Sequence, residues 1–216
     1  TNNITTGTLA DPRITLELVK QLHPNYNNSL QHDASEFFVD ILETFEHVKP
    51  ASTFMGSYKY TAICNNKSCG HQTYQLQDNP VMIINILQTY KKRETLKSCI
   101  NQAMSSKAIP TWICSQCGQK SDKNASIMSF QILPETLVIV LSKTDNSGNI
   151  LPTEVDIQHV LTPKDLKLPT SEIDAAYELC AIVKRIGTHV TSGHYTTCLR
   201  NTNNTWIHCN DDSITP

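Results

Sequence analysis

Two kinds of hydrophobic pattern divide the chain. Between residues 11 and 48 the apolar residues recur at helical spacing, whereas from about Ser57 onward short segments alternate apolar and polar residues. Recurrence every three or four residues predicts amphipathic helices, and alternation predicts half-buried strands. A helical segment followed by a long series of strands is typical of an α+β protein, which is the fold class we expect.

The helical part carries start signals of its own. Pro12 stands near a helix start, where its missing N–H costs nothing. In the second segment, Asp33 and Glu36 occupy the positions of an N-cap residue and its partner three residues on. The apolar stripe of that segment consists of Ala34, Phe37, Phe38, Ile41, Leu42 and Phe45.

The strand-like segments are rich in β-branched and aromatic residues and end at Asn, Gly, Pro or Asp. One helix interrupts them at 94–104, and we expect the last strands to be joined by turns at Gly187, at Gly193 and at 201–204. The predicted strands are 58–64, 71–77, 81–87, 111–114, 125–133 and 136–143, followed by 177–186, 194–200 and 205–210.

Composition narrows the class of protein. The chain has 216 residues, of which 39% are apolar, enough for a hydrophobic core. A net charge of −2 and a pI near 6.4 argue against a nucleic-acid binder, and we interpret the basic run at 91–93 as a solvated turn. We expect neither a membrane span nor a signal peptide, because no long apolar run occurs. Eight cysteines without a signal peptide favour a reducing compartment, the cytosol or the nucleus.

Four of the cysteines are spaced like metal ligands. Cys114 and Cys117 form a C-x-x-C-G knuckle, which turns two thiolates onto one ion, and Cys64 and Cys69 form a wider pair in a separate hairpin. Together they predict a structural zinc site. Two alternatives stay open, one in which His71 replaces a cysteine ligand and one in which the thiols are free or buried. Cys99 and Cys180 fall within apolar patterns and are expected in the core.

The last third supplies a candidate general base. His194 follows a glycine at a strand start, and imidazole exchanges protons near neutral pH. A lone strand histidine is more often structural. However, Asn210 lies on the next strand and shares a face with Trp206 and His208, so its amide could reach His194 and orient the ring.

These pieces resemble the ubiquitin-specific protease family in that family's order. The resemblance rests on "LQHDASEFFVDIL" at 30–42, the two cysteine pairs, "SGHYTT" at 192–197 and "WIHCNDDSITP" at 206–216. It implies a papain-like cysteine protease fold with a partial helical thumb (1–53), β-rich zinc-ribbon fingers (54–134) and a β-sheet palm (135–216). It also implies a thiol isopeptidase that cleaves after the C-terminal glycine of ubiquitin.

The resemblance implies roles for particular residues. His194 matches the general base, Asn210 the residue that orients it and Asp211 the neighbouring acid. Tyr195 matches an aromatic residue of the channel for the Gly-Gly tail. Asp33 and Glu36 match acidic positions near the arginines of that tail, and helix capping by Asp33 is compatible with this role.

The sequence departs from the family pattern in two places. No Gly-Asn-Thr-Cys box, the family's nucleophile segment, precedes Gln31, and a further palm strand after the stretch matching "DDSITP" is missing. The run "VIVLSKTD" replaces the family's "HLKRF"-like run. We therefore expect a fragment of a longer protease that is inactive by itself, because its nucleophile lies elsewhere.

Two other hypotheses remain open at this point. One is a non-catalytic scaffold that binds ubiquitin or ubiquitinated proteins and in which His194 is a relic. The other is a zinc-ribbon interaction module unrelated to ubiquitin. We expect no nucleic-acid or membrane partner, and no homo-oligomer in the intact parent protein.

Overall fold

Helical periodicity in the first fifty residues produces the expected helices, with one interruption. The computed structural model describes residues 12–28, 30–44, 49–86, 92–168 and 176–216. Pro24 breaks the predicted helical stretch, because it lacks the N–H that a continuing helix would use. Phe45 of the predicted stripe lies outside the described residues. The helices are α2 (Pro12–Leu22), η1 (Pro24–Tyr26), α3 (Ala34–Thr44) and α4 (Lys49–Ser52).

The short helix η1 is fastened to α3 by polar and aromatic contacts. The Tyr26 hydroxyl donates to Asp40 Oδ2 at 2.6 Å, and its ring meets Phe37 edge to face at 5.0 Å. Burial and the hydrogen bond to Asp40 raise the pKa of Tyr26 well above its usual value. His23 also hydrogen-bonds Thr44. These contacts belong to the first of two compact units, Thr1–Ala51; the second is Ser52–Pro216.

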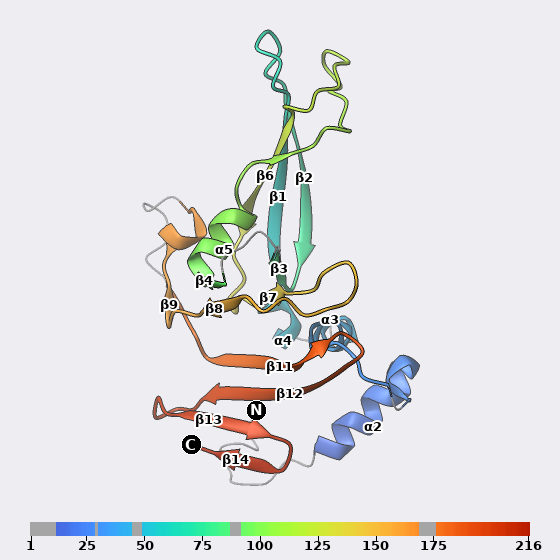
Figure 1. The fold of residues 1–216 in the computed structure, drawn as a ribbon, viewed down its shortest axis with the longest axis vertical. Coiled ribbons are helices and arrows are strands. Elements are labelled where there is room, and N and C mark those ends of the chain that lie inside the picture. The colour runs from blue at the N-terminus through green and yellow to red at the C-terminus, as the bar shows by residue number, and fades with distance from the viewer. Residues whose placement is uncertain (1–11, 29, 45–48, 87–91, 169–175) are drawn as a thin grey trace. The chain divides into compact units, whose positions relative to one another are not determined.

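A long sheet of order β2-β1-β6-β5 dominates the middle of the sequence (Figure 1). All of its pairings are antiparallel, and β1 lies between β2 and β6. This sheet places the β1–β2 loop and the β5–β6 loop at the same end, so that segments about fifty residues apart in the sequence lie side by side there (Figure 1). Its strands are β1 (Gly56–Ile63), β2 (Gln72–Asn79), β5 (Lys107–Ala108) and β6 (Ala125–Ile132).

The core of the second unit lies where α5 (Leu96–Ala103) packs against the sheets. Ile100 and Cys99 of this helix are fully buried, as expected for Cys99. Strand β3 (Met82–Asn85) pairs in parallel with β7 (Ile139–Ser142) and alternates in burial, since Ile84 is 1% exposed and Ile83 is 54% exposed. The buried core residues are Tyr58, Met82, Ile84, Ile86, Leu96, Cys99, Ile100, Met104, Leu161 and Leu166.

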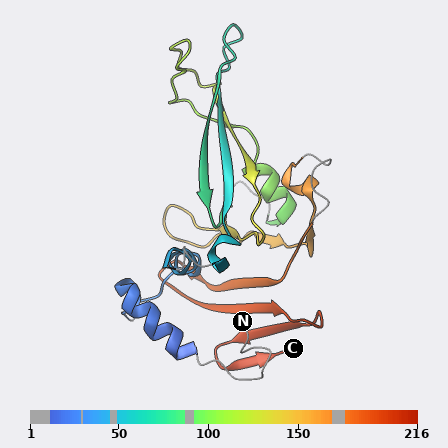
Figure 2. The same ribbon diagram turned by 180° about the vertical axis from the view of Figure 1, so that it is seen from behind.

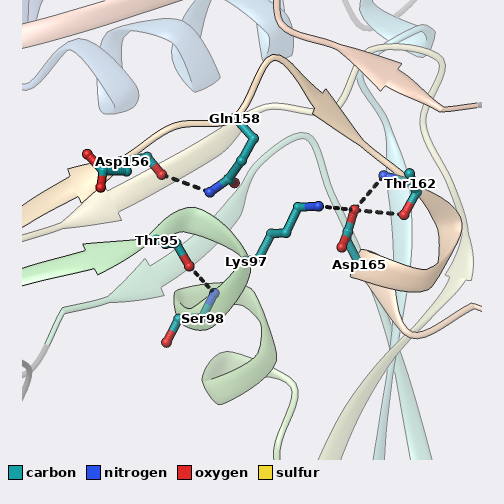
Figure 3. A network of polar contacts seen from close by, with 7 residues as sticks. All are labelled: Thr95, Lys97, Ser98, Asp156, Gln158, Thr162 and Asp165. Carbon is teal, nitrogen blue, oxygen red and sulfur yellow. Dashed lines mark hydrogen bonds and ion pairs between the residues drawn. The ribbon is translucent and has the colours of Figure 1, made fainter.

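Polar contacts tie α5 to the segment that follows β8 (Glu154–Asp156; Figure 3). Thr95 caps the helix by accepting from the Ser98 N–H at 3.1 Å, and Lys97 pairs with Asp165 of the 3-10 helix η2 (Pro163–Leu166) at 3.1 Å. Thr162, which precedes η2, forms a capping box with Asp165.

Residue 91 of the basic run lies outside the described residues, and the interpretation of 91–93 as a solvated turn is corrected only in part, because Arg93 is exposed but belongs to a strand. Arg93 lies in β4 (Arg93–Thr95), which pairs in parallel with β8 (Glu154–Asp156). Its guanidinium donates two hydrogen bonds of 2.8 Å to the Asp156 carboxylate. The pairing of the two strands brings these charges together, a contact that the local sequence does not indicate.

The last third of the chain forms an antiparallel sheet of order β11-β12-β13-β14 (Figure 2). The predicted strand at 177–186 is broken, because Tyr177–Glu178 (β10) pairs instead with Val160–Leu161 (β9). Cys180 falls in this break and is exposed, which contradicts its expected place in the core. The strands are β11 (Ala181–His189), β12 (Ser192–Arg200), β13 (Trp206–Asn210) and β14 (Ser213–Thr215).

Gly187 and Gly193 lie inside strands, which corrects their predicted place in turns. The turn between β11 and β12 falls at 190–191. Gly187 has φ 151° at a register shift, and a Cβ there would lie 2.7 Å from the Ser192 carbonyl oxygen. These glycines therefore permit a close approach of two strands. In the described residues, no helix has the length and apolar character needed to cross a bilayer.

Candidate functional site

The four predicted metal ligands converge at the loop end of the long sheet. The sulfur atoms of Cys64, Cys69, Cys114 and Cys117 all lie within 4.8 Å of one another. The Sγ atoms of Cys64 and Cys117 are 3.8 Å apart, as are those of Cys69 and Cys114. The described residues include all eight cysteines, and none of them forms a disulfide. Both cysteines of the wider pair therefore lie beside the knuckle cysteines, and His71 is not needed as a ligand. His71 instead contacts Ser115 Oγ at 3.2 Å.

Two glycines and one asparagine shape the loops that hold the thiols. Gly70 and Gly118 have φ values of 57° and 67°, so each ends its loop in the left-handed conformation that glycine favours. Asn124 is 1% exposed and links the two loops, since it accepts from the Asn65 N–H at 3.1 Å and donates to the Trp112 carbonyl at 3.2 Å. Sequence reasoning missed Asn124, because a single asparagine before a strand has no distinguishing pattern.

The geometry of the four sulfurs fits a tetrahedral zinc ion. A Zn–S bond of about 2.3 Å gives a tetrahedron whose edges are about 3.8 Å long. This edge equals the two sulfur–sulfur separations given above. Four thiolates are also a ligand set that zinc uses in closed, structural sites. The cluster could therefore hold zinc, since its remaining sulfur–sulfur separations are no more than 4.8 Å.

The thiols of the cluster differ in acidity. Burial raises the pKa of Cys114, but N–H groups of Cys117 and Gln116 outweigh it and lower the pKa to about 7. At Cys64, an Asn66 N–H lowers the pKa, but burial and the neighbouring sulfurs prevail and raise it to about 12. One thiolate therefore forms near neutral pH, while further deprotonation requires a cation to offset the accumulating charge.

The second group of predicted residues meets near the start of β12. His194 Nε2 lies 2.5 Å from Asn210 Oδ1 on β13, and the two strands pair with Thr197 opposite Cys209. In this register His194 and Asn210 are diagonal neighbours on one face of the sheet. The contact that the alternation predicted is therefore present.

This contact fixes the tautomer of the ring. Asn210 Oδ1 only accepts hydrogen bonds, so His194 Nε2 carries the hydrogen and Nδ1 keeps its lone pair. Asp211 Oδ2 lies 3.8 Å from Nε2. The His194 side chain is 43% exposed, so a reacting group has access to it. An oriented, accessible imidazole beside an amide and a carboxylate can act as a general base.

The remaining candidates are Tyr195, which shares β12 with His194, and Asp33 and Glu36, which belong to the other compact unit. Tyr195 follows His194 on β12, so it faces the other side of the sheet, where Arg185 is opposite. Asp33 and Glu36 lie in the first unit and are both exposed. Asp33 caps α3, because its Oδ1 accepts from the N–H of Ser35 at 2.8 Å and of Glu36 at 3.3 Å. The predicted capping role of Asp33 is confirmed.

The structure shows where each cysteine lies relative to His194. Cys198 is four residues further along β12, a distance of about 13 Å. Cys209 adjoins Asn210 and therefore faces the other side of β13. Cys180 precedes β11 at the far end of the sheet, and Cys99 is buried in α5. The other four thiols form the four-cysteine cluster.

Comparison with known proteins identifies the family. The family model for ubiquitin carboxyl-terminal hydrolase matches residues 3–216. Ubiquitin carboxyl-terminal hydrolase 20 of Arabidopsis thaliana is 22% identical over 89% of this chain and 29% of its own length. Probable ubiquitin carboxyl-terminal hydrolase 8 of Schizosaccharomyces pombe is 25% identical over 90% of this chain and 43% of its own length. The chain thus spans less than half the length of these relatives.

Solved structures show the same fold. The SAGA DUB module containing Ubp8, bound to monoubiquitin, superposes with a TM-score of 0.76 at 20% identity, over 93% of this chain and 48% of the other. The module bound to ubiquitin aldehyde gives 0.74 at 20% identity, with the same coverage. The predicted α+β, papain-like protease fold is therefore confirmed. By its sequence and its fold, the chain belongs to the ubiquitin carboxyl-terminal hydrolase family.

Proposed function

We propose that this chain is the part of a deubiquitinating thiol protease that supplies the general base for hydrolysis at the C-terminal glycine of ubiquitin. The observation that carries the proposal is the 2.5 Å contact between His194 Nε2 and Asn210 Oδ1, with Asp211 at 3.8 Å. Family membership supports the reaction class, and the bound ubiquitin in the structural relatives supports the substrate.

The tautomer of His194 defines how the proton moves. Nδ1 of His194 takes the proton of a cysteine thiol, and the thiolate sulfur attacks the carbonyl carbon of the ubiquitin glycine. The tetrahedral intermediate collapses to a thioester as the imidazolium returns the proton to the leaving lysine amine. Water, deprotonated by the same nitrogen, then hydrolyses the thioester and regenerates the thiol. Asn210 holds the ring throughout, and Asp211 lies beside it.

In this proposal the nucleophile is a cysteine outside residues 1–216. The positions of the eight cysteines support this assignment, because four form the metal cluster and the others lie away from His194 Nδ1. The chain alone is then inactive as a hydrolase. It contributes the base and the substrate surface, and a partner segment contributes the thiol.

Acidic and aromatic residues would recognise the ubiquitin tail. Asp33 and Glu36 are exposed carboxylates suited to pairing with the arginines of that tail, and Tyr195 would line the channel for its glycines. We assign residues 1–53 to a thumb, 54–134 to fingers and 135–216 to a palm around the substrate. Zinc in the cluster of four cysteines would fix the loop ends of the fingers and take no part in the chemistry.

The test uses the complete protein encoded by the open reading frame that contains this chain. We expect it to release a fluorophore from the C-terminus of ubiquitin, and we expect His194→Ala to abolish release while ubiquitin binding persists. Cys180→Ser, which changes an exposed cysteine outside both candidate sites, serves as the control. Binding of ubiquitin without hydrolysis by the complete wild-type protein would contradict the proposal and establish a non-catalytic ubiquitin-binding scaffold.

A further inference from the structure

The turn that precedes His194 is held by one side chain from the neighbouring strand. Nη2 of Arg185 lies 2.7, 2.9 and 3.1 Å from the carbonyl oxygens of His189, Val190 and Ser192. Carbonyl groups that converge in this way repel one another unless a donor lies between them, and a charged donor binds them more strongly than a neutral one. The guanidinium therefore holds the 189–192 turn closed.

Gly193 leaves the space that this arrangement needs. A Cβ on Gly193 would lie 3.2 Å from both Cζ and Nε of Arg185 and 2.8 Å from the Ile186 carbonyl oxygen. The guanidinium thus lies directly against the backbone of the residue before His194. Since Arg185 pairs with Tyr195 across the strands, it lies on the face opposite His194 and acts on the imidazole only through the backbone.

A second loop is attached to the same turn. The Val190 N–H donates to the Gly148 carbonyl at 2.9 Å, and the Ile150 N–H donates to the Thr188 carbonyl at 2.9 Å. Asp145 keeps this loop folded, since its carboxylate accepts from the N–H of Asn149 at 2.8 Å. The turn held by Arg185 therefore also anchors the 145–150 loop beside the start of β12.

We propose that Arg185 is the positioning residue of the candidate site: its guanidinium closes the 189–192 turn and thereby sets His194 where its imidazole meets Asn210. The inference rests on the proposed function, because that function gives the placement of His194 its importance. Only one residue, Gly193, separates the last bound carbonyl, that of Ser192, from His194. An open turn would shift the start of β12 and lengthen the 2.5 Å contact.

The test is the tautomer of His194 in the 216-residue chain, measured from its two imidazole ¹⁵N chemical shifts. In the wild-type chain we expect one protonated and one unprotonated nitrogen with distinct shifts, because Asn210 fixes the hydrogen on Nε2. In Arg185→Met, which keeps the apolar stem without its donors, we expect the two shifts to converge toward an exchange average, as in Asn210→Ala. Arg185→Lys, which retains donors on a shorter stem, should restore part of the separation.

Arg200→Met is the matched control, since Arg200 lies on the same strand as His194 and binds Glu178 and the Leu179 carbonyl at the other end. Distinct shifts in Arg185→Met, or equal changes in both Met variants, would overturn the proposal. If Arg185→Met does not fold, the Arg185→Lys variant decides the question. A partial separation of its two ¹⁵N shifts supports the proposal, whereas a separation as large as in the wild-type chain, or no separation, overturns it. The NMR measurement needs no catalysis. A result against the positioning role of Arg185 would therefore leave the proposed function intact, and a failure of the complete protein to hydrolyse its substrate would leave the positioning role intact.

Discussion

Removing one thiol from the four-cysteine cluster should cost the chain its zinc. We choose Cys117→Ser, because Cys117 is exposed and its replacement leaves the hydrophobic core untouched. The free energy of binding of a structural zinc ion is about 10–16 kcal/mol at neutral pH. If it is divided evenly over four thiolates, each contributes about 3 kcal/mol, so the loss of one should weaken zinc affinity roughly a hundredfold. Domains are stable by only about 5–15 kcal/mol, so a loss of this size should also lower the thermal midpoint.

The assay compares zinc content after dialysis against a chelator and thermal unfolding with and without added zinc. We expect one zinc per wild-type chain, less than one in Cys117→Ser, and wild-type behaviour in Cys180→Ser, which replaces an exposed cysteine outside the cluster. Zinc uptake at pH 8 should release protons, because Cys64 and Cys69 have raised pKa values. Full zinc retention in Cys117→Ser, with unchanged unfolding, would refute the reasoning.

Four further predictions follow from the structure. Asn210→Ala removes one hydrogen bond worth about 1 kcal/mol, so kcat of the complete protein should fall roughly fivefold with KM unchanged; an equal rise in KM would indicate a binding role instead. Asp33→Asn keeps the helix cap but removes the charge, so unfolding by urea should be unchanged while ubiquitin binding to this chain, measured by calorimetry, weakens; unchanged binding would remove Asp33 from the substrate surface. Ile100→Ala should destabilise the chain in urea by about 2–5 kcal/mol, far more than Ile83→Ala on an exposed position, and similar losses would contradict the assigned core. Burial raises the pKa of Tyr58 to about 12 from about 10 in the unfolded chain, so its stabilisation is present below pH 10 and lost as the pH rises to 12. Tyr58→Phe should lose this alkaline step in a pH series of urea unfolding, and an identical step in both chains would count against the assignment.

Periodic segments with a buried face could be predicted from the sequence. Alternation fits β3, because Met82 and Ile84 face the core while Ile83 between them faces solvent. Short elements could not be located this way. The predicted strand at 111–114 makes only an isolated bridge at Ile113, because the knuckle loop bends the chain, and β14 has only the residues Ser213–Thr215. Strands of two or three residues depend on tertiary partners and leave no periodic pattern.

In the candidate site, too, some contacts could be predicted from the sequence and others could not. The contact between His194 and Asn210 was predictable, because a two-residue period and a short connection place the two side chains on one face. Contacts from side chains to distant backbone groups were not. Arg185 and Asn124 bind carbonyl groups whose positions arise only after the loops fold. Cys180 was misassigned because an apolar pattern does not reveal that the strand breaks there.

The most direct test of the central claim is covalent capture of the nucleophile by ubiquitin carrying a C-terminal electrophile. The complete protein encoded by the open reading frame is treated with this probe, and the modified residue is located by mass spectrometry. We predict a single adduct on a cysteine outside residues 1–216, and its loss in His194→Ala. No adduct, an adduct on one of the eight cysteines of this chain, or labelling that does not depend on His194 would contradict the assignment of His194 as the general base for a thiol supplied from outside these residues.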